Sequence, residues 1–312
     1  MNTLAWLGCA AIALGLATAA PAVGADRALP STPMTTATNL ARPAMWQISD
    51  ADTTIYLFGT IHVLPGNVGW RTDAINRVIA KSDGLVLETM IDDAQPQSLA
   101  DDFRKLGARD GLQPFLYRFE AKNRPAIAAA IVKSGIPASR YDQLETWAAT
   151  LTLVGRQAGS SGFKGADGVE TVLMKNFLRA GKPVGQLETN VDQLSMYDGL
   201  SEQAQLSMLT GMIGDPGARA RSVRGQLDAM VGTWVSGDVD GIAQSFNAEL
   251  ADQPELRAAL LTRRNARWAS WIDQRMDQPG SVLVAVGAGH LAGEGSVLQA
   301  LEGHGYTVSR IQ

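Results

Sequence analysis

The sequence is poor in the residue types that usually carry reactive or metal-binding side chains. Its 312 residues include one cysteine and three histidines. The cysteine, Cys9, lies in an uncharged run near the start of the chain, so the remainder has neither disulfides nor thiolate chemistry. Imidazole chemistry can come only from His62, His290 or His304.

Also missing is a long run of basic residues. The formal net charge is -4, and this argues against a nucleic-acid partner, which would need a positive surface. Hydrophobic residues make up 46% of the chain and charged residues 19%, values typical of a folded globular protein with a substantial core.

Charge is absent from residues 3–23, "TLAWLGCAAIALGLATAAPAV". An apolar run followed by small residues predicts a signal peptide over residues 1–24, and hence export, most simply to a bacterial periplasm. The alternative is an uncleaved membrane anchor. Residues 25–43 are rich in Pro, Thr and Ala and are expected to form a flexible leader, which leaves residues 44–312 as the folded domain.

The rest of the chain alternates between short apolar runs and amphipathic stretches. "MWQISD" and "ADTTIYLFGT" predict a hairpin, "WRTDAINRVIAKSD" a helix, and "GLVLET" and "GSVLVAVGAG" buried strands. Residues 96–158 and 190–276 have mostly helical patterns. We therefore predict an α/β fold with a central mixed β-sheet, flanked by helices and carrying a large helical insertion.

Four polar residues share one setting: each follows an apolar, strand-like run. His62 and His290 come after the glycine-containing sequences "GTIH" and "GAGH", and Glu88 and Glu188 end "LVLE" and "GQLE". In open α/β sheets, ligands bind outside the carboxyl ends of the strands, so parallel neighbouring strands would bring these side chains together. Glycines at positions 59, 287 and 289 would allow tight turns and close backbone approach there.

Two imidazoles with one or two carboxylates form a suitable donor set for a divalent metal such as Zn, Mn or Co. With one coordination position open, the metal would activate water for hydrolysis. Purely structural roles fit the same pattern. Each histidine could instead bond a loop carbonyl, and Glu88 or Glu188 could cap the helix that follows it.

Several segments together resemble the TraB/GumN family, which is related to the TIKI proteases. They are "YLFGTIHVLP", "LVLET", "GKPVGQLET", "RRNARW" and "VAVGAGHLAGEGSVLQALEGHGYTV". The resemblance implies a fold shared with erythromycin-esterase-like and haem-binding ChaN-like proteins, and a metal-dependent hydrolase that cleaves peptides. It implies that His62, Glu88 and His290 bind the metal.

The same resemblance points to three further site residues. Glu188 matches the second "LET" of the family, and Arg264 and Asn265 match an "RN" pair in a late helix. We expect Glu188 to be a fourth ligand or a general base, and Arg264 to pair with a substrate carboxylate or a site glutamate. One departure is Glu170, which stands where relatives often have aspartate.

The leading hypothesis is therefore an exported metal-dependent hydrolase acting on a peptide or small molecule, with the membrane involved only through the signal segment. The alternative is a periplasmic binding or accessory protein for haem or a polysaccharide intermediate. His304, at a predicted helix end, and the Trp268/Trp271 pair are expected to be structural.

Overall fold

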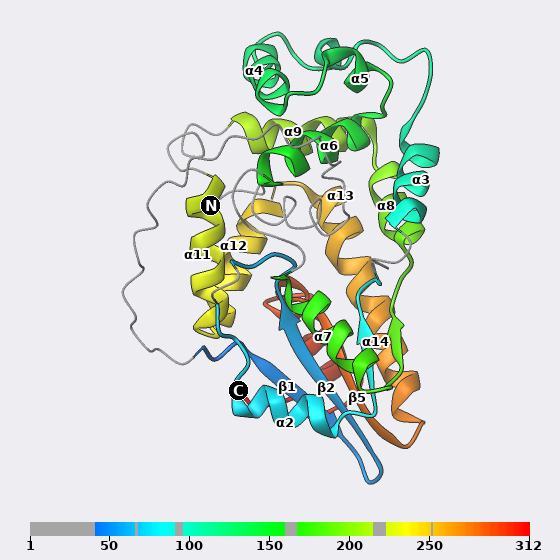
Figure 1. Cartoon of the computed structure of the whole chain (residues 1–312), viewed down its shortest axis with the longest axis vertical. Helices are drawn as coiled ribbons and strands as arrows, with labels where there is room; N and C mark the ends of the chain where they lie inside the picture. Colours follow the sequence, from blue (N-terminus) through cyan, green and yellow to red (C-terminus); the bar gives the residue numbers. More distant parts are fainter. Residues whose placement is uncertain (1–40, 66–67, 91–95, 160–166, 215–222, 251) are drawn as a thin grey trace.

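A computed structural model of the chain describes residues 41–65, 68–90, 96–159, 167–214, 223–250 and 252–312 (Figure 1). The predicted signal peptide, residues 25–40 of the predicted leader and most of an expected helix break at "GDPG" lie outside these ranges. Among the described helices, none combines the length and apolar character that crossing a membrane requires.

Within the described residues, six strands form one mixed sheet in the order β4-β3-β5-β2-β1-β6. The strands are β1 (Met45–Ser49), β2 (Thr53–Thr60), β3 (Gly84–Leu87), β4 (Val184–Gln186), β5 (Gly280–Gly287) and β6 (Ser309–Arg310). The four strands β4, β3, β5 and β2 are parallel, whereas β1 pairs antiparallel with both β2 and β6. The carboxyl ends of four strands consequently meet at one edge of the sheet.

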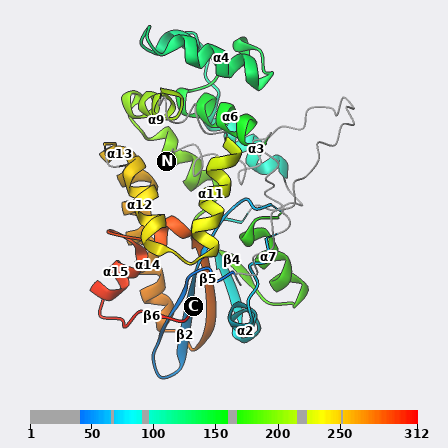
Figure 2. The same cartoon turned by 90° about the vertical axis from the view of Figure 1, so that its left-hand side faces the viewer.

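Helices cover both faces of the sheet (Figure 2). On one face, Tyr56 and Phe58 of β2 pack in a core with α2 (Asp73–Lys81) and α7 (Val169–Arg179). Because side chains alternate along a strand, Ile55 and Leu57 point to the other face. There they pack in a second core with α14 (Arg263–Met276) and α15 (Val297–Gly303).

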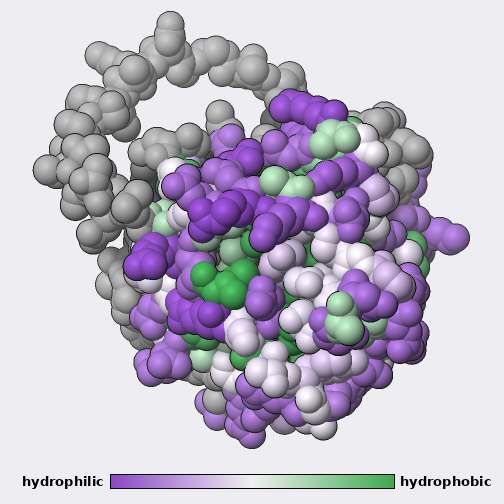
Figure 3. Space-filling view, turned by 90° about the horizontal axis from the view of Figure 1, so that it is seen from below, coloured by the Kyte–Doolittle hydropathy of each residue, from purple (hydrophilic) through white to green (hydrophobic). Residues whose placement is uncertain are grey.

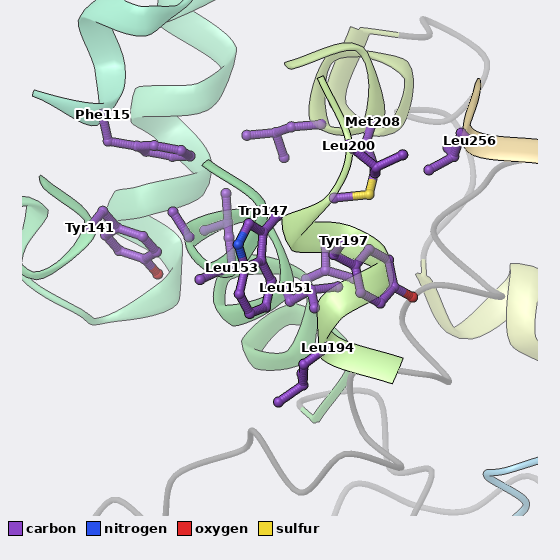
Figure 4. Close-up of a cluster of buried hydrophobic side chains, with 14 of the residues drawn as sticks. Phe115, Tyr141, Trp147, Leu151, Leu153, Leu194, Tyr197, Leu200, Met208 and Leu256 are labelled. Atoms are coloured by element: carbon purple, nitrogen blue, oxygen red, sulfur yellow. The ribbon is translucent and has the colours of Figure 1, made fainter. Parts of the chain in front are cut away.

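A third core belongs to the helices beyond the carboxyl edge of the sheet, in the upper half of Figure 1. Trp147 is fully buried at its centre, and its ring stacks on Tyr197 with 6.4 Å between centroids (Figure 4). Two further helices, α11 (Val223–Val235) and α12 (Val239–Leu250), contribute to the core on the Tyr56 and Phe58 face of the sheet. The described α-helices outside the two sheet layers are α3 (Pro96–Gly107), α4 (Arg124–Ser134), α5 (Ala138–Asp142), α6 (Thr146–Gly159), α8 (Asn190–Asp198), α9 (Glu202–Gly214) and α13 (Pro254–Arg257).

Short irregular helices complete the part of the chain that the structure describes. They are two 3-10 helices, Phe115–Arg118 and Ala288–Leu291, and a π-helix, Ala258–Thr262, which runs directly into α14. The opposite end of the molecule, seen from below in Figure 3, is largely hydrophilic with a small hydrophobic patch near its centre.

The predicted α/β class and the β1–β2 hairpin are confirmed. The strand-like run before Glu188 forms β4, which pairs with β3 and so divides the helical insertion. One detail differs from expectation. The β2-α2-β3 unit does not place its strands side by side, because β5, from near the other end of the chain, pairs with both.

Candidate active site

The four strand-end residues of the sequence pattern lie along the carboxyl edge of the parallel strands. The order of the strands places Glu188 beside Glu88, followed by His290 and then His62. The backbone N–H of Glu188 donates to the carbonyl of Glu88 at 3.1 Å, so the two carboxylates start from adjacent strands. Two buried negative charges this close need a cation between them.

That cation is the guanidinium of Arg264, which reaches the edge from the first turn of α14. Its Nε donates to Glu188 Oε2 at 3.1 Å, and its Nη2 donates to one oxygen of each glutamate. Nη1 donates to the carbonyl of Leu260 and to Nε2 of His290, both at 3.1 Å. Arg264 is therefore fully engaged within the protein, and its guanidinium carbon lies 4.6 Å from the ring centroid of Trp268.

Burial opposes ionisation in this cluster; Arg264 counteracts this effect for the two glutamates and reinforces it for His290. Burial alone would raise the pKa of Glu88, but the nearby guanidinium holds it below the usual range of a glutamate. Burial raises the pKa of Glu188, with Arg264 opposing the rise. Burial and Arg264 together lower the pKa of His290 to about 3, so this imidazole is neutral at physiological pH.

Asn265 fixes the orientation and tautomer of His290. The amide nitrogen of Asn265 donates to the carbonyl of Gly295 at 2.7 Å, which turns its oxygen toward Nδ1 of His290 at 2.6 Å. Nδ1 must then carry the proton, and Nε2 is left with a lone pair, the atom that Arg264 approaches.

His62 has an equivalent partner in Glu170, whose Oε1 lies 2.8 Å from Nδ1 of His62. Thr60 donates its hydroxyl to the same carboxylate oxygen. Burial would lower the pKa of His62, but the charge and hydrogen bond of Glu170 outweigh it and raise the pKa to about 9. Both site histidines are thus held through Nδ1 by a side-chain oxygen.

Gly287 leaves a small space into which both rings face. A methyl group on its Cα would stand 3.5 Å from Glu88 Oε2, 3.5 Å from His290 Cδ2 and 3.7 Å from His62 Nε2. Gly59 permits close approach in another way, since a methyl there would stand 3.2 Å from the Cα of Ala288. Of the two roles predicted for these glycines, close approach is the one that the structure supports.

The structure therefore brings together all the residues that sequence reasoning selected. Asn265, which only the family resemblance suggested, contacts His290 directly. Glu188 does not cap the helix that follows it, because Thr189 is the N-cap residue of α8 and forms a capping box with Asp192.

Three contacts were missed. Gln193 of α8 donates to Glu88 at 2.9 Å, Trp268 packs against His290 with ring centroids 4.4 Å apart, and Thr60 supports Glu170. Trp268 was expected to be structural, and its fully buried ring does belong to the core behind the sheet. The sequence could have indicated the contact of Gln193, because this residue lies about one turn into the helix that follows "LET".

A family model described as the TraB/PrgY/gumN family matches residues 44–310. The chain belongs to the TraB/PrgY/gumN family. It is also similar to an uncharacterised protein, YbaP, of Escherichia coli (strain K12) and of Shigella flexneri. Each is 24% identical over 250 residues, which cover 79% of this chain and 87% of the relative. No solved structure matches the chain.

In this TraB/PrgY/gumN protein, the side chains form a guanidinium-centred cluster. Among the described residues, no group of three or more His, Cys, Asp or Glu side chains stands in the arrangement of a metal site. The donor chemistry nevertheless suits a divalent metal: Nε2 of His62 and Oε2 of Glu88 border the space at Gly287, and Nε2 of His290 lies 4.0 Å from the same Glu88 oxygen. Coordination by His290 would require Nη1 of Arg264 to move off its Nε2 atom.

Proposed function

We propose that this protein is an exported metal-dependent hydrolase of the peptidase type, whose metal is held by His62, Glu88 and His290. One observation carries the proposal. Each imidazole is fixed through Nδ1 by a side-chain oxygen, from Glu170 or Asn265, and both rings border the same space at Gly287. Metal-binding histidines have this second partner, because it orients the ring and raises the basicity of Nε2.

Charge supports the same proposal. Among the residues that the structure describes, the cluster contains the carboxylates of Glu88, Glu170 and Glu188 and one buried guanidinium, that of Arg264. Arg267 approaches Glu188 at 3.5 Å, but its side chain is 59% exposed and largely solvated. His62, with its pKa raised to about 9, is protonated in the metal-free protein and offsets one carboxylate. When both imidazoles bind a metal they are neutral, and a divalent cation would then balance the three carboxylates together with Arg264.

A bound divalent metal would supply Lewis acidity and lower the pKa of its water toward about 7, so that hydroxide forms near neutral pH. Glu88 would ligate through Oε2, the oxygen that Arg264 leaves free and toward which Gly287 N–H donates at 3.3 Å. Glu188 has both oxygens on Arg264, so we revise its expected role from ligand or base to positioning of Arg264.

The peptide substrate rests on the family resemblance alone. The alternative, a haem-binding or polysaccharide-related accessory protein, receives less support from the site. Haem binding uses an apolar surface and one accessible axial ligand, whereas His290 is buried in a polar cluster with Asn265 and Arg264.

Metal analysis of purified protein tests the proposal. We expect about one Zn, Mn or Co ion per chain in the wild type and a large loss in His62→Ala and in His290→Ala. His304→Ala is the matched control, because His304 lies at the end of α15, outside the cluster. Low metal in the wild type after reloading, or equal metal in all four proteins, would overturn the proposal.

Activity and export need separate measurements. Metal-loaded wild type should cleave members of a mixed peptide library, and chelation should abolish this cleavage. Mass spectrometry of the protein from the periplasmic fraction should give an amino terminus near residue 20 to 25, as expected for removal of the apolar segment. Full-length protein retained in the cytoplasm would contradict export without affecting the metal site.

A further inference from the structure

Two hydrogen bonds hold Glu170 and the start of its helix against the end of β2. The backbone N–H of Val169 donates to the carbonyl of Ile61 at 3.1 Å, which attaches the start of α7 to the residue before His62. Thr60, the last residue of β2, donates its hydroxyl to Oε1 of Glu170. The carboxylate therefore has little freedom to move relative to the imidazole of His62.

The two oxygens of this carboxylate are used unequally. Oε1 receives Thr60 and faces Nδ1 of His62 at 2.8 Å, whereas Oε2 is buried and has no hydrogen-bond partner among the described residues. A buried acceptor left without a partner costs free energy, and folded proteins keep few such groups. An orienting contact with a functional histidine gives a reason for keeping this one.

The start of α7 also favours a carboxylate at this position. Glu170 lies in the first turn of the helix, where the partial positive charge of the backbone N–H groups stabilises an anion. The N-cap residue, Gly168, has no side chain with which to cap the helix. Its first turn can therefore hold the charge of Glu170 while the carboxylate faces His62.

From these contacts we infer that Glu170 is a positioning residue that fixes the ring of His62 with Nε2 directed toward Glu88 and His290. The inference deepens the proposed function, and its effect on metal binding rests on that function. The orientation of the His62 ring does not depend on the proposed function, and it can be measured in metal-free protein. An aspartate side chain is one methylene group shorter, so its carboxylate at this position would not reach Nδ1 of His62.

The orientation is tested by NMR of metal-free protein labelled in its histidine side chains. Since the chain has three histidines, His62→Ala assigns the resonance. We expect a slowly exchanging Nδ1–H signal for His62 in the wild type and its loss in Glu170→Ala and Glu170→Asp. Glu170→Gln should restore it, because its amide oxygen still accepts. Circular dichroism and thermal unfolding establish that each variant is folded.

Glu202 offers a matched control. It also lies in the first turn of a helix, α9, and accepts a threonine hydroxyl, from Thr146 at 2.8 Å, but no histidine contacts it among the described residues. Glu202→Ala should leave the His62 signal and zinc affinity unchanged. In equilibrium dialysis, Glu170→Ala and Glu170→Asp should weaken zinc binding by roughly 10- to 100-fold.

The outcomes separate the two claims. Persistence of the His62 signal in folded Glu170→Ala, or zinc affinity within about twofold of wild type in that variant, overturns the inference. If the wild type binds no zinc but Glu170→Ala still loses the signal, the positioning role stands and the proposed function fails.

Discussion

Arg264 holds Glu188 with two hydrogen bonds, from Nε to Oε2 at 3.1 Å and from Nη2 to Oε1. This fork-to-fork contact joins the start of α14 to the end of β4, through residues that are 76 positions apart. The same guanidinium also donates to Glu88. One buried side chain thereby connects the two acidic strand ends with the helix that covers them.

Removal of that guanidinium should leave two buried carboxylates without their partner. We expect Arg264→Met to destabilise the protein by about 3–5 kcal/mol, measured by urea unfolding, because buried charges lose compensation. Arg264→Lys keeps the positive charge but loses the planar guanidinium that binds both oxygens, so it should lower the free energy of unfolding by less. Arg263 is exposed in the same helix turn, and Arg263→Met should change stability by less than about 0.5 kcal/mol. Equal effects at the two positions would contradict the central role of Arg264.

Gly287→Ala tests whether the metal occupies the space at Gly287 in a protein that still folds. The added methyl would meet its neighbours at 3.5–3.7 Å, which is ordinary van der Waals contact, so we expect a folded protein with nearly unchanged thermal stability. Because the methyl fills the space between the two imidazoles and Glu88, we expect loss of bound metal and of hydrolysis. Full metal content in this variant would place the metal elsewhere.

Asn265→Ala should affect His290 in two ways. The Nδ1–H of the buried imidazole loses its acceptor, which costs about 1–3 kcal/mol in urea unfolding, and the ring is no longer held in one orientation. Metal affinity, measured by dialysis, should fall by roughly 10- to 100-fold. Asn76, which accepts from Arg71 at the surface, is the control, and Asn76→Ala should change neither property appreciably.

Lys182 makes a structural contact that is independent of the site. Its ammonium donates to the carbonyls of Ile79, Ala80 and Ser82 at 3.3, 2.8 and 2.6 Å, at the end of α2. We expect Lys182→Met to destabilise the protein by about 1–2 kcal/mol in urea unfolding, since these carbonyls lose a charged donor. Lys133 is exposed in the last turn of α4, and Lys133→Met should have a smaller effect.

Asp192 should contribute to the pH dependence of stability. Hydrogen bonds from the Thr189 side chain and backbone lower the pKa of Asp192 below its ordinary value. A depressed folded-state pKa means that its stabilisation is present above the unfolded pKa of about 3.9 and is lost as the pH falls through the folded value. Urea unfolding between about pH 6 and pH 2 should show a weaker decline for Asp192→Asn than for wild type.

Much of the fold followed from local pattern. The run "ADTTIYLFGT" predicted one strand of a hairpin and forms β2, whose odd and even residues enter separate cores. The insertion of β5 between β2 and β3 could not be predicted, because strand order depends on contacts between segments about 200 residues apart. The last strand, β6, forms a ladder only at Ser309–Arg310, where it pairs at the edge of the sheet with β1.

The sequence pattern by itself selected four residues of the candidate site, the two histidines and two glutamates that follow strands, because side chains at the carboxyl ends of neighbouring parallel strands lie at one edge of the sheet. Only the tertiary structure decided how they pair. Arg264 takes both oxygens of Glu188, and Glu170 takes His62, because α14 and α7 approach the edge of the sheet from opposite faces. Hydrogen-bond partners depend on positions to within a fraction of an ångström, and packing between distant segments sets those positions.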